Sequence, residues 1–313
     1  MSSPRIQIGM TNLNLAPKDL LRYNWKDYVA ALDRGKFDRS AGYEWSDVRG
    51  TRSAARSLAR LRYISVLHES WREDRWRDVC ARAAGRLGGH VVESAGVAAL
   101  FPLLDKSDRR LGELDDVAGG TLPIIVHPHG QALDNHWQRR SRRLPDQWPA
   151  EDVWFQPTAE WAAVQGIDPT SKDIPTMARD IVHQAIEQGM GGIALDLHHL
   201  TSERMGHQFS DPTALAIQLA RGNWVKEIQP SIRPDFGGDK NALSNALKGN
   251  LAQTRIGEML LGISEALPQT PVTPMRIVPE IRPSAIAAAG YRDYLAATAV
   301  VNDSIRQIFS AAS

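Results

Sequence analysis

The run GGIALDLHHL, residues 191–200, decides how the rest of the chain is interpreted. Its apolar part, GIAL, is continuous instead of alternating, which is typical of a strand buried on both faces of a sheet. A carboxylate and two imidazoles, those of Asp196, His198 and His199, follow where such a strand ends. The run TLPIIVHPH, residues 121–129, has the same order, an apolar stretch that ends in two histidines. The two runs predict buried parallel strands whose carboxyl ends carry polar, chemically active side chains.

Eight short runs rich in β-branched residues predict strands, and stretches of helical periodicity lie between them. The strands are expected at residues 5–12, 42–48, 63–69, 121–129, 153–158, 192–199, 224–231 and 275–282. The clearest helices are expected at 174–188, 213–220, 242–267 and 289–311. Strand alternating with helix favours right-handed βαβ units and a parallel sheet. Eight such units favour one α/β domain, residues 1–313, folded as a closed (β/α)8 TIM barrel, with an open doubly wound sheet as the alternative.

Composition places the chain among ordinary globular proteins. Its 37 Lys and Arg residues balance 36 Asp and Glu, and 42% of its residues are hydrophobic. A net charge of +1 argues against a general nucleic-acid-binding protein. The single cysteine, Cys80, excludes a disulfide framework and favours a reducing compartment. No apolar stretch is long enough for a membrane span and no secretory signal is visible, so we expect a cytoplasmic protein.

Polar residues gather at the predicted carboxyl ends of the strands, where a barrel places its active site. Five of the nine histidines lie there, and an isolated charge at the end of a buried strand is costly unless it is paired or bound to a ligand. The residues concerned are His68, His127, His129, Gln156, Asp196, His198, His199, Gln229 and Glu280. Asp and His both serve as ligands of divalent metals and as acid–base pairs, and these two uses stay open at this point.

Further residues are candidates for binding the substrate. Arg140 belongs to the arginine-rich run QRRSRR, and Arg282 follows Glu280 by two residues. Either guanidinium could hold a phosphate or carboxylate through two hydrogen bonds. Trp45 lies near a strand end, where an aromatic wall suits the face of a sugar. The chain has no dinucleotide-binding or phosphate-loop motif, so a nicotinamide or flavin cofactor is not indicated.

The order of these residues resembles that of the xylose isomerase-like barrels, which include sugar isomerases, sugar epimerases and abasic-site nucleases of the endonuclease IV type. In that family a His ends an early strand, as His68 does, and a second His ends the next, where His127 or His129 stands. An Asp followed three residues later by His ends the sixth strand, and a Glu ends the eighth. Asp196 with His199, and Glu280, match those places.

The chain also departs from the family pattern. Its fifth strand carries Gln156 where the family has Glu, and its seventh carries Gln229 where the family has His. The resemblance implies one divalent metal (Mn, Fe, Co, Zn or Mg) held by Asp196 and Glu280, with Gln156, Gln229 and His68 as the further ligands. An amide can ligate weakly through its oxygen, but it cannot take up a proton at neutral pH.

The function implied is metal-assisted proton transfer that isomerises or epimerises a small polyhydroxy or keto compound, which can carry a phosphate or a carboxylate. Glu280 is expected to act as the base, with His199 or His127 making the second proton transfer and His129 binding substrate. Two alternatives stay open, namely a metal-independent lyase, cyclase or binding barrel, and a metal-dependent nuclease of abasic sites. Barrels of this kind are often homo-oligomers, although no residue here identifies an interface.

Overall fold

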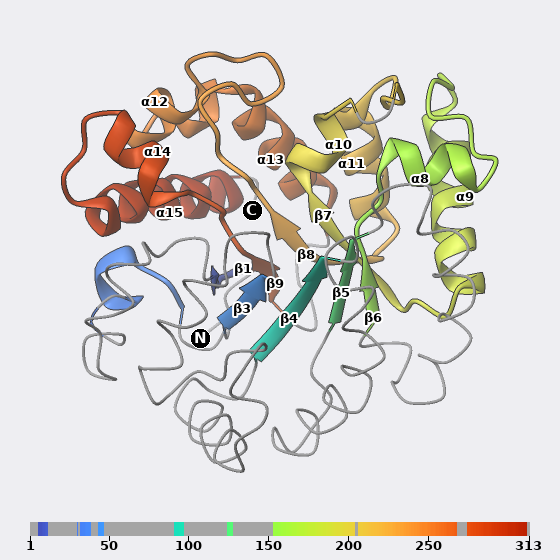
Figure 1. Cartoon of the computed structure of the whole chain (residues 1–313), viewed down its shortest axis with the longest axis horizontal. Helices are drawn as coiled ribbons and strands as arrows, with labels where there is room; N and C mark the ends of the chain where they lie inside the picture. The colour runs from blue at the N-terminus through green and yellow to red at the C-terminus, as the bar shows by residue number, and fades with distance from the viewer. Residues whose placement is uncertain are drawn as a thin grey trace, which may run out of the picture.

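The computed structural model describes residues 6–11, 30, 32–38, 43–46, 91–96, 124–127, 153–203, 206–267 and 274–311, those at 11, 43–46, 91–96, 124–127 and 153 through the backbone alone. The chain is an α/β protein with a parallel sheet and helices beside it (Figure 1). In the order β1-β9-β8-β7-β6-β5-β4-β3-β2, every neighbouring pair of strands runs parallel. The strands are β1 Ile6–Ile8, β2 Met10–Thr11, β3 Tyr43–Ser46, β4 Val91–Gly96, β5 Ile124–His127, β6 Val153–Phe155, β7 Gly192–Asp196, β8 Val225–Gln229 and β9 Met275–Ile277.

Seven of the eight predicted strands contain an observed one, and the exception concerns the third position. The strand between β3 and β5 is β4, a run that the periodicity did not single out. The predicted strand at 63–69, with His68 at its end, lies outside the described residues. The α/β class and the parallel sheet are thus confirmed.

The described helices are α8 Ala159–Val164, α9 Ile174–Glu187, α10 Leu197–Thr201, α11 Pro212–Arg221, α12 Ala242–Leu247, α13 Arg255–Ala266, α14 Pro283–Ala288 and α15 Tyr294–Ala311, with the short 3-10 helix η5 Leu251–Gln253. Side-chain caps explain several of their first residues. The Asp173 carboxylate accepts the backbone N–H of Thr176 at α9, and Asp211 accepts that of Ala214 at α11. Both helices also begin with Pro in the first turn, where no N–H is lost.

The single helix expected at 242–267 is wrong, because α12 ends in a glycine cap. Gly249 has a φ of 82°, a left-handed conformation that suits glycine. The N–H of Asn250 donates to the carbonyl of Asn245 and that of Gly249 to Ala246, the bonds of a Schellman motif. The next α-helix is α13, and at its N-cap the Thr254 hydroxyl accepts the N–H of Gly257.

The helix expected at 289–311 begins later than predicted. Gly290 has a φ of 90° and separates α14 from α15. The Asp293 carboxylate then accepts the N–H of Ala296 in the first turn of α15. Helices α8, α10 and α14 were not predicted, since each has only five or six residues, too few to show a helical period.

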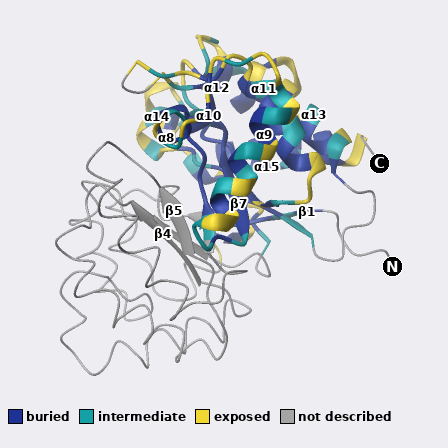
Figure 2. Cartoon of the chain, turned by 90° about the vertical axis from the view of Figure 1, so that its right-hand side faces the viewer, coloured by how far each residue is buried: buried dark blue, intermediate teal, exposed yellow. Residues whose placement is uncertain are grey.

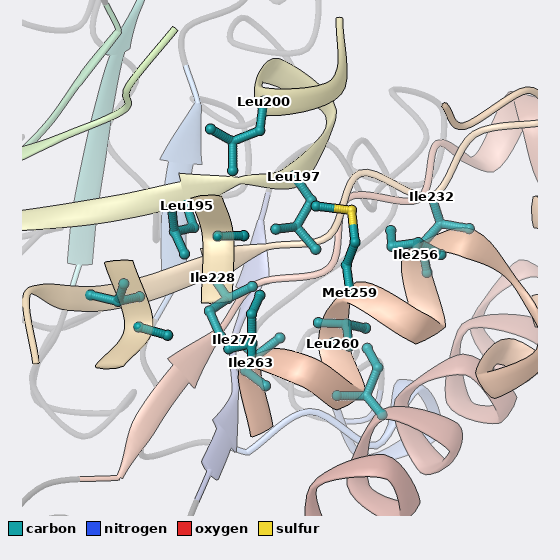
Figure 3. Close-up of a cluster of buried hydrophobic side chains, with 14 of the residues drawn as sticks. Leu195, Leu197, Leu200, Ile228, Ile232, Ile256, Met259, Leu260, Ile263 and Ile277 are labelled. Carbon is teal, nitrogen blue, oxygen red and sulfur yellow. The ribbon is translucent and has the colours of Figure 1, made fainter. Parts of the chain in front are cut away.

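The hydrophobic core lies between the sheet and the helices. Figure 3 shows Leu195, Ile228 and Ile277, from β7, β8 and β9, beside Leu260 and Ile263 of α13. All five side chains are fully buried. Figure 2 shows that the helices keep exposed residues on their outer side and buried ones toward the strands.

Strand alternation sends the other residues of the same strands away from this core. Ala194 and Trp154 pack together apart from the main cluster. Glu227 of β8 is the register partner of Ala194, and Arg276 of β9 is the register partner of Glu227, so both belong to the same face of the sheet as Ala194. Both are buried. The second face of the sheet is therefore lined in part by charged and polar side chains. Within the described part of the chain, every helix is too short or too polar to cross a bilayer.

Candidate active site

Four of the predicted site residues come together at the carboxyl ends of β6 to β9. Gln156 follows the last residue of β6, while Asp196 and Gln229 end β7 and β8 and are register partners. Glu280 lies three residues beyond β9 and pairs with Ser231 in an isolated parallel bridge. Gln156 and Gln229 have no exposed surface and Asp196 is 3% exposed. The parallel arrangement of the strands thus gathers side chains that are far apart in the sequence.

Asp196 both ends the strand and begins the next helix. Its Oδ1 accepts the N–H groups of His198 and His199, at 2.8 and 3.1 Å, as the N-cap of α10. This turn brings the His199 ring back to the carboxylate, with Nδ1 3.4 Å from Oδ2. The proximity of Asp196 and His199 within this run is a direct consequence of the cap.

The two carboxyl groups at this edge of the sheet affect one another. Burial raises the pKa of Asp196 to about 7, and the negative charge of Glu280 adds to the rise. The N–H groups of His199 and His198 and the charge of Arg233 act in the opposite direction. A carboxyl group with this pKa exchanges its proton near neutral pH, as a general acid or base must.

Glu280 keeps partial contact with solvent, but the surrounding protein removes much of the water from its carboxylate. This desolvation raises its pKa, and the charge of Glu227 contributes to the rise. The Ser231 hydroxyl donates to Oε2 at 2.7 Å and lowers the pKa, as do the nearby charges of Arg233 and Arg282. Burial and the charge of Glu227 thus raise the pKa of Glu280, while the charges of Arg233 and Arg282 limit the rise.

A chain of buried side chains leads from His199 into the sheet. The His199 Nδ1 lies 2.9 Å from the Gln156 Oε1, and the Gln156 Nε2 donates to the Gln229 Oε1. The Gln229 Nε2 donates in turn to the Glu227 Oε1 at 2.7 Å. The other oxygen of Glu227 forms an ion pair with Arg276, whose Nε lies 2.9 Å away. This set of five residues is called the amide chain below.

The described residues do not fit the divalent metal that the family resemblance implies. Within the described ranges, no three His, Cys, Asp or Glu side chains are grouped as a metal requires. The two amide oxygens that could have served as ligands are engaged in the amide chain, that of Gln229 with Gln156 and that of Gln156 with His199.

The remaining predicted residues divide into two groups. His127 is the last residue of β5 and Trp45 lies in β3, both described through the backbone alone. His68, His129 and Arg140 lie outside the described residues. Arg282 precedes α14 as its N-cap residue, is exposed, and acts on Glu280 through its charge.

Sequence reasoning missed Glu227, Arg276 and Ser231. Glu227 precedes Gln229 by two residues in the same strand, so it lies on the same face, and this spacing could have revealed it. Arg276 is a lone charge in the short apolar strand MRI, which also indicates a buried partner.

The chain matches no known protein family and no curated protein sequence.

Proposed function

We propose that this chain is an enzyme that moves a proton next to a carbonyl group, and so isomerises or epimerises a small polyhydroxy or keto compound. The observation that carries the proposal is the juxtaposition of Asp196, Glu280 and His199 at one edge of the sheet. Two carboxyl groups whose charges repel resist ionising together, so one can accept a proton while the other donates.

The proposed fold is a closed (β/α)8 barrel. The strands β1 and β2 are separated only by Gly9, yet they lie at opposite ends of the sheet order. There β1 pairs with β9 and β2 pairs with β3. If residues 6–11 count as one strand, the order returns to its starting point after eight strands. This pairing supports closure, and closure would surround Asp196 and Glu280 with the loops that bind substrate.

The roles of the side chains follow from their surroundings. We assign Glu280 as the base, because the charges of Arg233 and Arg282 oppose the rise in its pKa that burial causes. It takes the proton from the carbon next to the carbonyl, and the electron pair of that C–H bond becomes the C=C double bond of an enediol. Asp196, which keeps its proton up to about neutral pH, donates that proton to the carbonyl oxygen. His199 then takes the proton of the neighbouring hydroxyl and passes it to the ionised Asp196, while Glu280 gives its proton to the former carbonyl carbon, which yields the isomer.

The two arginines also indicate which substrates suit the site. Arg233 affects both Asp196 and Glu280, and Arg282 affects Glu280, so both guanidinium groups lie near the reacting atoms. A guanidinium binds a phosphate or carboxylate through paired hydrogen bonds. We therefore favour a phosphorylated or carboxylated sugar or keto acid over a neutral one.

The test uses hydrogen exchange, which requires no knowledge of the product. The protein is incubated in D2O with a panel of aldose and ketose phosphates and hydroxy and keto acids, and deuterium uptake at carbon is measured by mass spectrometry. Uptake by the wild type that is lost in Glu280→Gln supports the proposal. Glu258→Gln, on the exposed side of α13, is the matched control and should exchange normally.

A chelator separates the proposed reaction from the metal-assisted one. Exchange that persists after dialysis against EDTA supports transfer by side chains alone. Exchange that is lost and then restored by Mn2+, Co2+ or Zn2+ would show that a metal assists, with ligands beyond the described residues. A wild type that binds a member of the panel without exchange would be a binding protein, and this outcome would overturn the proposal.

A further inference from the structure

The amide chain has a direction, and its direction is set by Glu227. A carboxylate has only acceptor oxygens, so Gln229 must turn its Nε2 toward Glu227. Its Oε1 then faces Gln156 and must receive an N–H, which Gln156 supplies through its Nε2. Each amide can both donate and accept, but the carboxylate at the end of the chain decides which end of each amide points which way.

The direction reaches the imidazole of His199. Once the Nε2 of Gln156 is committed to Gln229, its Oε1 is the atom that faces His199 Nδ1, at 2.9 Å. The Oδ2 of Asp196 lies 3.4 Å from the same nitrogen and is a second acceptor once this carboxyl group is ionised. Because an amide oxygen can only accept, the ring nitrogen that faces it must carry the hydrogen. We propose that Glu227 is a positioning residue that fixes the Nδ1–H tautomer of His199, so that Nε2 is the nitrogen that exchanges protons.

The ion pair makes Glu227 suitable for this role. Arg276 is 8% exposed and Glu227 has no exposed surface, so their pairing is shielded from water. The guanidinium pairs by charge with one carboxylate oxygen, while the other oxygen accepts from Gln229. Because all the donors and acceptors are buried, reversing one amide alone would place two donors or two acceptors face to face. The chain must therefore reverse as a whole or not at all.

The use of the tautomer in catalysis rests on the proposed function, but the tautomer itself does not. With the hydrogen on Nδ1, the Nε2 lone pair can accept a proton from the substrate and return it. With the hydrogen on Nε2, the basic nitrogen would face Gln156 and be lost to the reaction. General acid–base catalysis contributes about 10²–10⁴-fold to a rate, so a wrong tautomer should cost at least about 100-fold in kcat/KM.

Glu227→Gln tests the direction without removing a hydrogen-bonding group. In the original direction the new amide nitrogen would face the Arg276 guanidinium, donor against donor. Turned the other way, the new amide accepts from Arg276 and donates to Gln229, and every bond of the chain reverses. Gln156 then presents its Nε2 to His199, which must carry its hydrogen on Nε2 instead.

The measurement is a long-range 1H–15N correlation spectrum of 15N-histidine-labelled protein, at a pH where the ring is neutral. The signals of His199 are identified by their absence from His199→Gln. We expect the Nδ1–H pattern in the wild type and mainly the Nε2–H pattern in Glu227→Gln. Gln229→Met cuts the chain and should give a mixture, which provides a second variant if the first does not fold.

Asn302→Ala is the control, since it removes a buried hydrogen bond to the Gly35 carbonyl away from the amide chain. It should lower stability while leaving the Nδ1–H pattern unchanged. An Nε2–H pattern in the wild type overturns the proposal without any variant, and so does an Nδ1–H pattern that survives in folded Glu227→Gln. If the tautomer changes as expected but the wild type shows no deuterium exchange, the positioning role stands and the proposed function fails.

Discussion

The burial of Asp196 makes a quantitative prediction about stability and pH. The unfolded chain releases the proton of this carboxyl group near its ordinary pKa of 3.8, but the folded protein holds it until about pH 7. Between these values the folded state binds more protons than the unfolded state, so stability falls as pH rises through that window. Above about pH 7 both states are ionised and the loss is complete.

The magnitude follows from the width of the window. Each unit of difference between the folded and unfolded pKa is worth about 1.4 kcal/mol. Ionising Asp196 therefore lowers the free energy of unfolding by about 4 kcal/mol in total. About 3 kcal/mol of this falls between pH 5 and pH 8. Asp196→Asn removes the charge but keeps an oxygen that can accept the N–H groups of His198 and His199, and Asn is as good an N-cap as Asp.

The assay is urea unfolding of the wild type and of Asp196→Asn at pH 5 and at pH 8. Relative to the wild type, the variant should gain about 3 kcal/mol in free energy of unfolding between the two pH values. Any cost of the altered contact with His199 is the same at both and cancels. Asp211→Asn is the matched control, because Asp211 caps α11 in the same way at an exposed position. If the free energies of unfolding of Asp196→Asn and the wild type differ by the same amount at both pH values, ionisation of Asp196 does not destabilise the fold.

Three further predictions concern the site and its support. Ser231→Ala removes the hydroxyl that donates to Glu280, so the pKa of this carboxyl should rise and the pH at which deuterium exchange begins should move upward. Arg276→Met leaves the charge of Glu227 buried without its partner and should lower the free energy of unfolding by about 3–5 kcal/mol in urea. Gly257→Ala should lower the melting temperature, with a cost of about 1–3 kcal/mol, because a Cβ there would lie 1.9 Å from a backbone carbonyl oxygen.

Controls distinguish these effects from general damage. Ser264→Ala, at a buried serine of α13, should leave the pH profile of exchange unchanged. A double variant with Arg276→Met and Glu227→Leu should recover part of the stability lost in the single one, since no buried charge remains. Gly262→Ala meets only the end of the Ile217 side chain, which can move, and should cost less than Gly257→Ala. The opposite order would contradict the packing at η5 and α13.

The sequence predicted the elements whose signal is local. The helix expected at 174–188 has a cap, a proline and a clear apolar period, and it was placed to within one residue. The helix expected at 242–267 failed because its apolar period continues across Gly249, while the left-handed turn there depends on one residue. Strand β4 has only two consecutive β-branched residues, and its place between β3 and β5 is decided by pairing.

The candidate site was predictable where chemistry coincides with the end of a strand. Asp196, His199 and Glu280 follow apolar runs directly, and parallel strands bring such ends together. Glu227 was not predictable in this way, since it stands inside the strand VKEIQ beside the exposed Lys226. Its burial depends on Arg276, which lies 49 residues further along the chain and reaches Glu227 only through the pairing of β8 with β9.

The presence of Glu227 also explains why uncharged amides stand at positions 156 and 229. A glutamate at position 229 would place a second carboxylate 2.7 Å from that of Glu227 in a site without solvent, where like charges repel strongly. Position 229 must therefore donate to Glu227, and it must accept from position 156, which itself must donate to Gln229 while accepting from His199. The amide of glutamine meets both demands, because it donates through Nε2 and accepts through Oε1. Gln229 thus satisfies the buried carboxylate two residues earlier in its strand, and Gln156 continues the same direction of hydrogen bonding to His199.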